Sequence, residues 1–218
     1  MLSAWKRSRL PPEYQEVEWI GCPQQSTPII IPYINTGISP AEDVEMIAVV
    51  RQLLTSNSTN IFGSRDTSKQ ANFFCNTNFE NNRCVVYFYN YTYTTDGNRD
   101  LQSWMQVKYT STGGQTIYIE DGGRTVNVNY RCTVYPAYPI YLFARNENGN
   151  QRGGQGLYMK SAKILKSGIR IRDFVPCVRQ SDNEPGMYDL CGSICPLTNS
   201  PFYTNAGTGA FIVGPDVN

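Results

Sequence analysis

Apolar and polar residues alternate with a period of two along most of this chain, and no window of adequate length shows the i, i+3, i+4, i+7 spacing of an amphipathic helix. Residues 43–53 are one example, because successive residues of a strand point to opposite faces of a sheet. One face of that strand would carry Val44, Met46, Ala48 and Val50. The pattern predicts an all-β protein.

A meander of antiparallel strands is predicted at residues 104–109, 116–120 and 125–130. Gly113-Gly114 and Asp121-Gly122-Gly123 lie between these segments, and both residue types tolerate the positive φ that a tight connection demands. Each strand should therefore pair with the next one along the chain.

Further strands are expected at residues 140–144 and 157–165, followed by polar or Gly-rich loops at 146–150 and 166–168. Short strands at near-regular spacing, without crossover helices, favour a two-sheet antiparallel sandwich or jelly roll over βαβ units. Because the chain has no internal repeat and no long linker, we expect one jelly-roll domain over residues 11–218.

A single strand over residues 84–94 would place a row of tyrosines on one face, namely Tyr87, Tyr89, Tyr91 and Tyr93. Packed against the second sheet, this tyrosine ladder would be core. Exposed, it would offer a protein interface or rings on which a sugar stacks. The pattern leaves all three interpretations open.

Composition and charge exclude several functions. The 218 residues hold 19 Lys and Arg against 18 Asp and Glu, a net charge of +1, so no strong field favours nucleic acid as a partner. The sequence has no histidine, which removes Ser-His-Asp and Cys-His nucleophile pairs, histidine-bearing zinc sites and an imidazole base. With 40% hydrophobic residues, the chain can bury a substantial core.

The first ten residues have a local basic excess and an aromatic side chain, from Trp5, Lys6, Arg7 and Arg9. Pro11 and Pro12 follow instead of an apolar run, so we expect no secretory signal peptide here. We expect residues 1–10 to form an arm, either a frayed terminus or a tether that docks on a partner. No apolar run approaches the ~20 residues that span a bilayer, so no membrane insertion is expected.

The seven cysteines are scattered, and no two of them form a C-x-x-C pair. An odd number leaves one thiol over even after full pairing. Cys191 and Cys195 are the only close pair, and a four-cysteine zinc site would need a second one. This spacing predicts mostly reduced, buried thiols.

A series of short segments carries a family resemblance: residues 10–20 (LPPEYQEVEWI), 33–40, 61–65, 118–122, 140–144, 171–176, 186–189 and 202–209. In this order they resemble concanavalin A-like, laminin-G-like jelly-roll domains of gut-bacterial surface proteins and their phages. The resemblance implies a curved two-sheet sandwich whose first and last strands meet, and a role in adhesion, glycan contact or particle architecture. The sequence departs from the family at 21–32 and 176–196, where we expect loops adapted to a partner.

Some relatives of this jelly roll are glycoside hydrolases, which need two carboxyl groups about 5–9 Å apart across the sugar. Glu16 and Glu18, at i and i+2, would share one strand face. The resemblance at this strand is to non-catalytic domains, however, so we expect no catalytic residue.

Laminin-G-like domains often hold calcium at a sheet rim, through carboxylate and carbonyl oxygens. Candidate ligands in or near predicted loops are Asp96, Asp100, Asp121 and Asp189. Their spacing is unlike that of an EF-hand, and simple solvation at the surface is the alternative for each.

These observations predict a non-enzymatic bacteriophage virion structural protein, a capsid-decoration, tail or fibre component assembled in the host cytoplasm. Its partners would be other virion proteins and further copies of itself, with bacterial-surface or mucin glycans as possible ligands. The alternative is a carbohydrate-binding adhesin module on a bacterial cell surface. The host, the glycan and the position in a particle depend on loops, which differ among proteins that share one fold.

Overall fold

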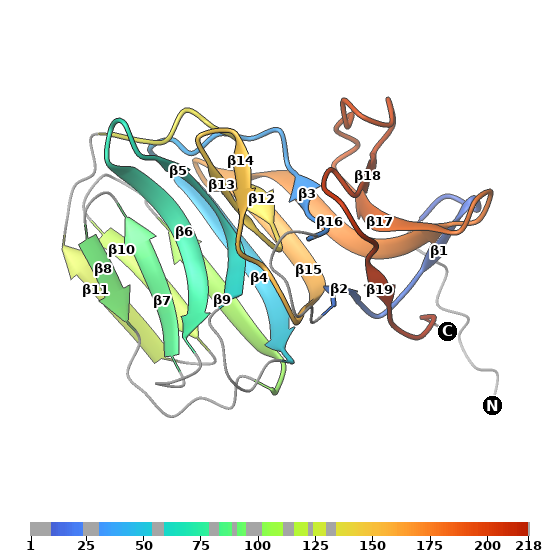
Figure 1. Ribbon diagram of the computed structural model, residues 1–218, viewed down its shortest axis with the longest axis horizontal. Coiled ribbons are helices and arrows are strands. Elements are labelled where there is room, and N and C mark those ends of the chain that lie inside the picture. Colours follow the sequence, from blue (N-terminus) through green and yellow to red (C-terminus); the bar gives the residue numbers. More distant parts are fainter. Residues whose placement is uncertain are drawn as a thin grey trace.

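A computed structural model describes residues 10–23, 31–53, 59–78, 83–88, 91–94, 102–110, 116–121, 124–129 and 134–217. The basic residues of the expected arm, together with Trp5, Tyr89, Asp96 and Asp100, lie outside the described residues. Every regular element of the described chain is a strand, which confirms the all-β prediction, and the strands form two sheets packed face to face (Figure 1). No described segment forms a helix long and apolar enough to cross a membrane.

The larger sheet has the order β11-β10-β9-β4-β15-β16-β17-β18. These strands are β11 (Arg124–Asn129), β10 (Thr116–Asp121), β9 (Met105–Thr110), β4 (Val44–Gln52), β15 (Leu157–Lys166), β16 (Ile169–Arg179), β17 (Glu184–Asp189) and β18 (Phe202–Thr204). The consecutive antiparallel pairing of β9, β10 and β11 is the predicted meander.

Three short strands join this sheet beside its main path: β1 (Tyr14–Glu16), β2 (Ile20–Cys22) and β19 (Ile212–Val213). β1 pairs with β16, while β2 pairs with both β15 and β19. β19 therefore meets β2, and beyond β19 Val217 N donates a hydrogen bond to Glu16 O of β1, so the two ends of the domain meet, as the family resemblance implied.

The smaller sheet has the order β14-β13-β5-β6-β7-β8. Its strands are β14 (Asn150–Arg152), β13 (Arg145–Glu147), β5 (Thr59–Asp66), β6 (Ala71–Asn78), β7 (Arg83–Phe88) and β8 (Tyr91–Thr94). β12 (Tyr141–Leu142) joins β3 (Ile34–Asn35) to β5. All of these pairings are antiparallel except the short one between β13 and β5, which is parallel.

The main core lies between the two sheets. Alternate residues of β4 are buried in it, as predicted: Val44, Met46, Ala48 and Val50. From the facing sheet, Phe73 meets Tyr109 edge to face at 4.5 Å between ring centroids. Burying a large apolar side chain contributes roughly 1.5–3 kcal/mol, so this alternation supplies much of the folding free energy.

β16 changes its partner on one side half-way along its length, while β17 pairs with it on the other side from Phe174 to Arg179. Residues up to Phe174 pair with β15, and Cys177–Arg179 pair with β1 instead. The strands β1, β16, β17 and β18 thereby form an extension at one end of the sandwich (Figure 1). A second cluster packs there, made of Leu10, Tyr14, Val175, Cys177 and Phe202.

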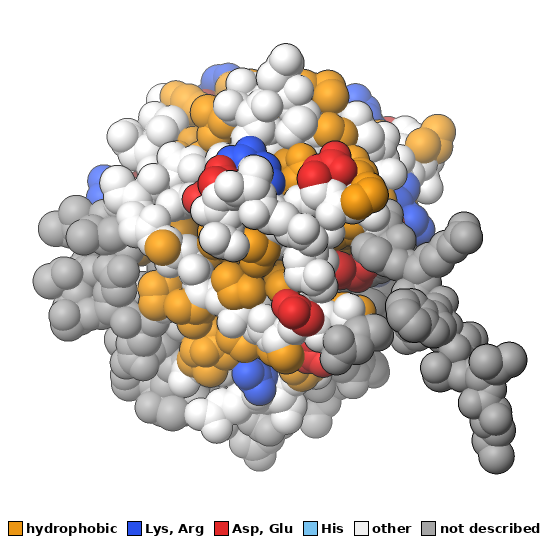
Figure 2. Space-filling view, turned by 90° about the vertical axis from the view of Figure 1, so that its right-hand side faces the viewer, with side chains coloured by type: hydrophobic (Ala, Val, Ile, Leu, Met, Phe, Trp, Pro, Cys, Tyr) orange, Lys and Arg blue, Asp and Glu red, His pale blue; other side chains and the backbone are white. Residues whose placement is uncertain are grey.

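Two sequence expectations need revision at this extension. Most of segment 176–196 belongs to the β16–β17 hairpin and is not a loop, because Pro176 is paired with Met187 and the antiparallel register continues to Arg179 opposite Glu184. Leu10, counted with the arm, is buried in the second cluster. Hydrophobic side chains also reach the surface at this end of the molecule (Figure 2), where Ile194 and Leu197 are exposed.

The expected strand over 84–94 is two strands. β7 and β8 pair antiparallel, with Tyr87 opposite Thr92 and Phe88 opposite Tyr91. The chain therefore reverses within the proposed tyrosine ladder, and the alternation that put four tyrosines on one face does not run through. A role for Tyr87, Tyr91 and Tyr93 in an interface or in sugar stacking stays a prediction.

Candidate functional site

A row of aromatic rings and cations lies on the face of the larger sheet that points away from the core. Tyr158 of β15 is in register with Arg51 of β4, and both flank buried residues of their strands. Trp104 precedes β9, and Trp19 precedes β2, which pairs with β15. We call Trp19, Tyr158, Arg51, Trp104 and Lys160 the cation–aromatic row.

Contacts within the cation–aromatic row are close and regular. The rings of Trp19 and Tyr158 stack at 4.0 Å between centroids, with 20° between their planes. The Arg51 guanidinium carbon lies 5.1 Å from the ring centroid of Tyr158 and 5.1 Å from that of Trp104. Lys160 Nζ is 4.5 Å from the centroid of Trp104. Each cation is thus attracted to the negative face of a ring, worth about 0.5–1 kcal/mol at exposed sites.

Two glycines make room for these rings. A Cβ at Gly21 would lie 2.1 Å from Cδ1 of Tyr158, and one at Gly214 would lie 2.6 Å from Cε2 of Trp19. The rings can therefore lie flat across neighbouring backbone, half-exposed in a fixed orientation.

The charged ends of Lys160 and Glu18 are the polar groups of the row that a ligand can reach, whereas Arg51 Nε is buried and donates no hydrogen bond to any described residue. Lys160 Nζ is 3.9 Å from Glu18 Oε2, and both of these side chains reach solvent. Flat apolar rings beside hydrogen-bond donors and one carboxylate acceptor suit a ligand with an apolar face and hydroxyl groups at its edge.

Glu16 and Glu18 do not form a carboxylate pair on one strand. β1 ends at Glu16, which is buried, and Glu18 lies in the bend before β2 and is exposed. The i, i+2 argument for a hydrolase pair therefore does not apply, and Glu18 instead belongs beside the cation–aromatic row.

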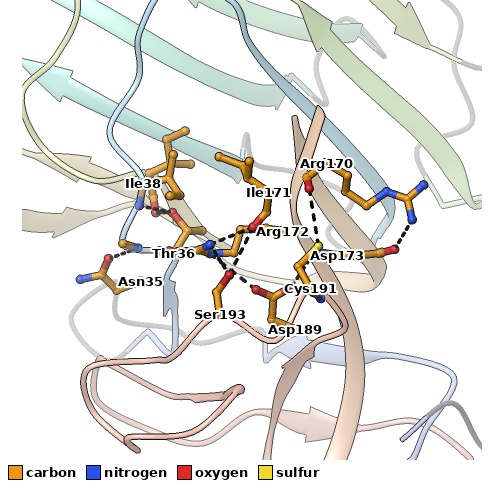
Figure 3. A network of polar contacts seen from close by, with 12 residues as sticks. Asn35, Thr36, Ile38, Arg170, Ile171, Arg172, Asp173, Asp189, Cys191 and Ser193 are labelled. Carbon is orange, nitrogen blue, oxygen red and sulfur yellow. Dashed lines mark hydrogen bonds and ion pairs between the residues drawn. The ribbon is translucent and has the colours of Figure 1, made fainter. Parts of the chain in front are cut away.

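Asp189, a candidate calcium ligand, is fully buried and not solvated as the alternative supposed. Its Oδ1 accepts hydrogen bonds from the backbone N–H of Asp173 at 2.8 Å and of Cys191 at 3.0 Å. Its Oδ2 lies 3.7 Å from Nε of Arg172, whose Nη1 donates to Ser193 Oγ at 2.6 Å (Figure 3). Arg172 Nε also donates to Thr36 O.

This Arg172–Asp189 network connects β16, the segment after β17 and the segment after β3 (Figure 3). Asp189 Oδ1 accepts hydrogen bonds from the protein's own backbone donors, and its Oδ2 is buried beside the Arg172 guanidinium, so a cation there would meet a positive charge and would be poorly placed to bind. Asp121 ends β10, and within the described part of the chain no three His, Cys, Asp or Glu side chains are grouped to hold a metal ion. Calcium binding stays a prediction without an assigned site.

Burial agrees with the prediction at four of the five cysteines whose side chains the structure describes, Cys22, Cys75, Cys177 and Cys195. Cys191 is exposed. Burial raises the pKa of Cys22 and of Cys177 to about 12. Although the side chain of Cys191 reaches solvent, partial desolvation of the thiol, with the carboxylates of Asp189 and Asp173 nearby, also raises its pKa above the ordinary value.

We expect iodoacetamide to alkylate Cys191 in the folded protein while those four buried cysteines stay unmodified. Because the thiolate is the reacting form and the pKa of Cys191 is raised, alkylation at pH 8 should be slower than in the unfolded chain. The difference should shrink as the pH rises. Peptide mass spectrometry over time measures both, and equally fast labelling of Cys22 or Cys177 would contradict the prediction.

Comparisons with known proteins found likeness at the level of structure alone. No protein-family model matches the sequence, and no curated protein matches it. A native heptameric SAP-like pentraxin from Limulus polyphemus matches with a TM-score of 0.56 at 11% identity, over 92% of this chain and 95% of that one. The galectin LEC-6 of Caenorhabditis elegans matches with a TM-score of 0.40 at 12% identity, over 70% of this chain and 96% of that one.

The pentraxin match defines the class of fold. A likeness over nearly the whole of both chains confirms the predicted two-sheet sandwich of the concanavalin A-like type. At 11% identity it identifies the fold and not the ligand.

Proposed function

We propose that this protein is a non-enzymatic, lectin-like module that binds saccharide on the cation–aromatic row. The observation that carries the proposal is the pair of half-exposed tryptophans, Trp19 and Trp104, linked by Tyr158 and two cations on the outer face of a sheet. An outward sheet face is ordinarily polar, so a row of three rings there needs a reason. A partner with a flat apolar side supplies one.

The row is built before a ligand arrives. Stacking of Trp19 on Tyr158 and of Arg51 between two rings fixes their side-chain rotamers. Fixing them in advance lowers the conformational entropy that binding would otherwise cost, about 0.5–1.5 kcal/mol per side chain. A sugar seated beside Trp104 could accept a hydrogen bond from Lys160, whose Nζ already lies over that ring, and donate one to Glu18.

The test is binding of the chain to an array of bacterial-surface and mucin glycans, with and without calcium. We expect saturable binding that Trp104→Ala weakens at least about tenfold, or ~1.4 kcal/mol, because the stacking surface is removed. Gln106→Ala is the matched control, since Gln106 is exposed on β9, the strand that begins directly after Trp104. It should bind like the parent.

Two outcomes would overturn the proposal. One is binding that Trp104→Ala and Gln106→Ala weaken equally, and the other is no saturable binding to any glycan class. Thermal unfolding of both variants within a few degrees of the parent ensures that a loss reflects the site and not the fold.

We further propose that the module acts in several copies as a virion component, with an adhesin of the bacterial surface as the alternative. Support for the virion comes from the sequence resemblance, and support for an oligomer from the pentraxin likeness, which is to a heptameric protein. Repeated copies would turn weak single-site binding into strong attachment. Light scattering gives the copy number, and mass spectrometry of purified particles tests the location.

A further inference from the structure

Three arginines converge on one glutamate on the outer face of the smaller sheet, opposite the face that carries the row. Glu147 Oε2 is 3.1 Å from Nη1 of Arg65 and 2.9 Å from Nη2 of Arg145, and Glu147 Oε1 is 3.5 Å from Nε of Arg152. The side chains come from β5, β13 and β14. We call Arg65, Arg145, Arg152 and Glu147 the guanidinium cluster.

The backbone register brings these side chains together. The parallel pairing of β13 with β5 sets Glu147 beside Arg65, and the β13–β14 hairpin sets Arg145 opposite Arg152. Because the register is fixed on both sides of β13, the cluster is a property of the sheet and not of a loop.

Arg145 forms the inner side of the cluster, against the sheet. The Arg145 guanidinium lies 4.6 Å from the ring centroid of Phe74, and Phe74 is itself 2% exposed. Phe74 fits there because its partner across the sheet is Gly63. Arg145 is thus held in place, with 18% of its side chain exposed, against 39% for Arg65 and 62% for Arg152.

The charges of the cluster do not balance. Among the described residues, three guanidinium groups, which stay protonated at any physiological pH, share a single carboxylate, so the exposed Arg65 and Arg152 carry positive charge that Glu147 alone does not neutralise. The neighbouring Asp66 does not offset this charge, because its carboxylate is buried and bound to Ser68 and Lys69. Like charges held this close repel, and a second anion would relieve the repulsion.

We propose that the guanidinium cluster binds the carboxylate or sulfate group of an acidic saccharide. The planar donors of Arg65 and Arg152 reach solvent and match the oxygen pairs of both groups. That the anion belongs to a saccharide rests on the proposed function, whereas the anion site itself does not. The two sites lie on opposite faces of the sandwich, so each can be tested without the other.

The experiment measures binding of the full chain to dextran sulfate, to polygalacturonate and to uncharged dextran by isothermal titration calorimetry. We expect the cluster to bind at least one of the two charged polymers and not to bind dextran. Comparing dextran sulfate with polygalacturonate shows whether the cluster prefers sulfate or carboxylate. Arg152→Gln and Arg65→Gln should each weaken that binding at least tenfold. Arg145 is left intact because it covers Phe74.

Lys69→Gln is the matched control, since Lys69 is an exposed cation near the cluster that pairs with Asp66. It removes the same charge and should change affinity less than twofold. No binding to either charged polymer would overturn the proposal, as would an equal loss in Lys69→Gln and Arg152→Gln, which would indicate unspecific attraction to positive charge.

The two proposals fail separately. If Trp104→Ala leaves glycan binding unchanged but Arg152→Gln removes polyanion binding, the anion site stands and the saccharide row falls. If Trp104→Ala weakens binding of neutral glycans but the protein binds neither charged polymer, the saccharide row stands and the anion site falls.

Discussion

Replacing Asp189 by Ala should lower the free energy of unfolding by about 3–5 kcal/mol, the usual cost of leaving one partner of a buried ion pair alone. The change leaves the Arg172 guanidinium without the carboxylate that lies 3.7 Å from its Nε, and the Arg172 side chain is only 14% exposed. It also removes the acceptor for the N–H groups of Asp173 and Cys191. A domain has only about 5–15 kcal/mol to lose. Urea denaturation followed by tryptophan fluorescence measures the change.

Asp182→Ala is the control for this prediction. Asp182 also forms an ion pair, with Arg179 Nη2 at 2.6 Å, but at the surface, where solvent screens it. We expect no measurable change in stability from that variant. Equal effects of the two substitutions would show that burial of the Arg172–Asp189 network does not matter.

Gly63→Ala should be the most damaging substitution of a single methyl group in the smaller sheet. The new Cβ would lie 2.0 Å from Cβ and 2.5 Å from Cα of Phe74, and 2.8 Å from the carbonyl oxygen of Phe73. These are mostly backbone positions of β6, so the clash can be relieved only by parting β5 from β6. We expect a loss of at least about 4 kcal/mol, in the range that marks a severe packing defect.

Circular dichroism during heating checks this prediction, because at this chain length ~1 kcal/mol corresponds to about 2–4 °C in Tm. Gly168→Ala is the matched control: its φ is +75° and a Cβ there would meet no atom within 4 Å. That variant carries backbone strain alone, about 1–2 kcal/mol. A smaller fall in Tm for Gly63→Ala than for Gly168→Ala would contradict the close approach of β5 and β6.

Local alternation was sufficient to predict the fold class, the strand β4 and the meander β9–β11, because these depend on neighbours along the chain. It failed where strands are short or polar. Residues 146–150 looked like a loop, yet β13 and β14 pair there around Asn148 and Gly149, a turn pair flanked by polar strands. The guanidinium cluster was invisible for the same reason.

The cation–aromatic row could not be found from sequence because its parts are distant in the chain. Trp19, Arg51, Trp104 and Tyr158 meet only through the register of β2, β4 and β15 and the start of β9. One local signal existed, Gly21 placed two residues after Trp19. Gly21 can be interpreted only once the ring that packs on it is known, and the pairing of β2 with β15 places Tyr158 there.

Along β16, the side chains of two successive residues point into different cores. Phe174 packs in the main cluster and Val175 in the cluster of the extension. Phe174 and Val175 are adjacent in β16, so both cores depend on the same strand. Disorder in one core would therefore disturb the other. The extension is therefore no appendage, and its amide hydrogens should exchange with solvent together with those of the sandwich, in one cooperative opening.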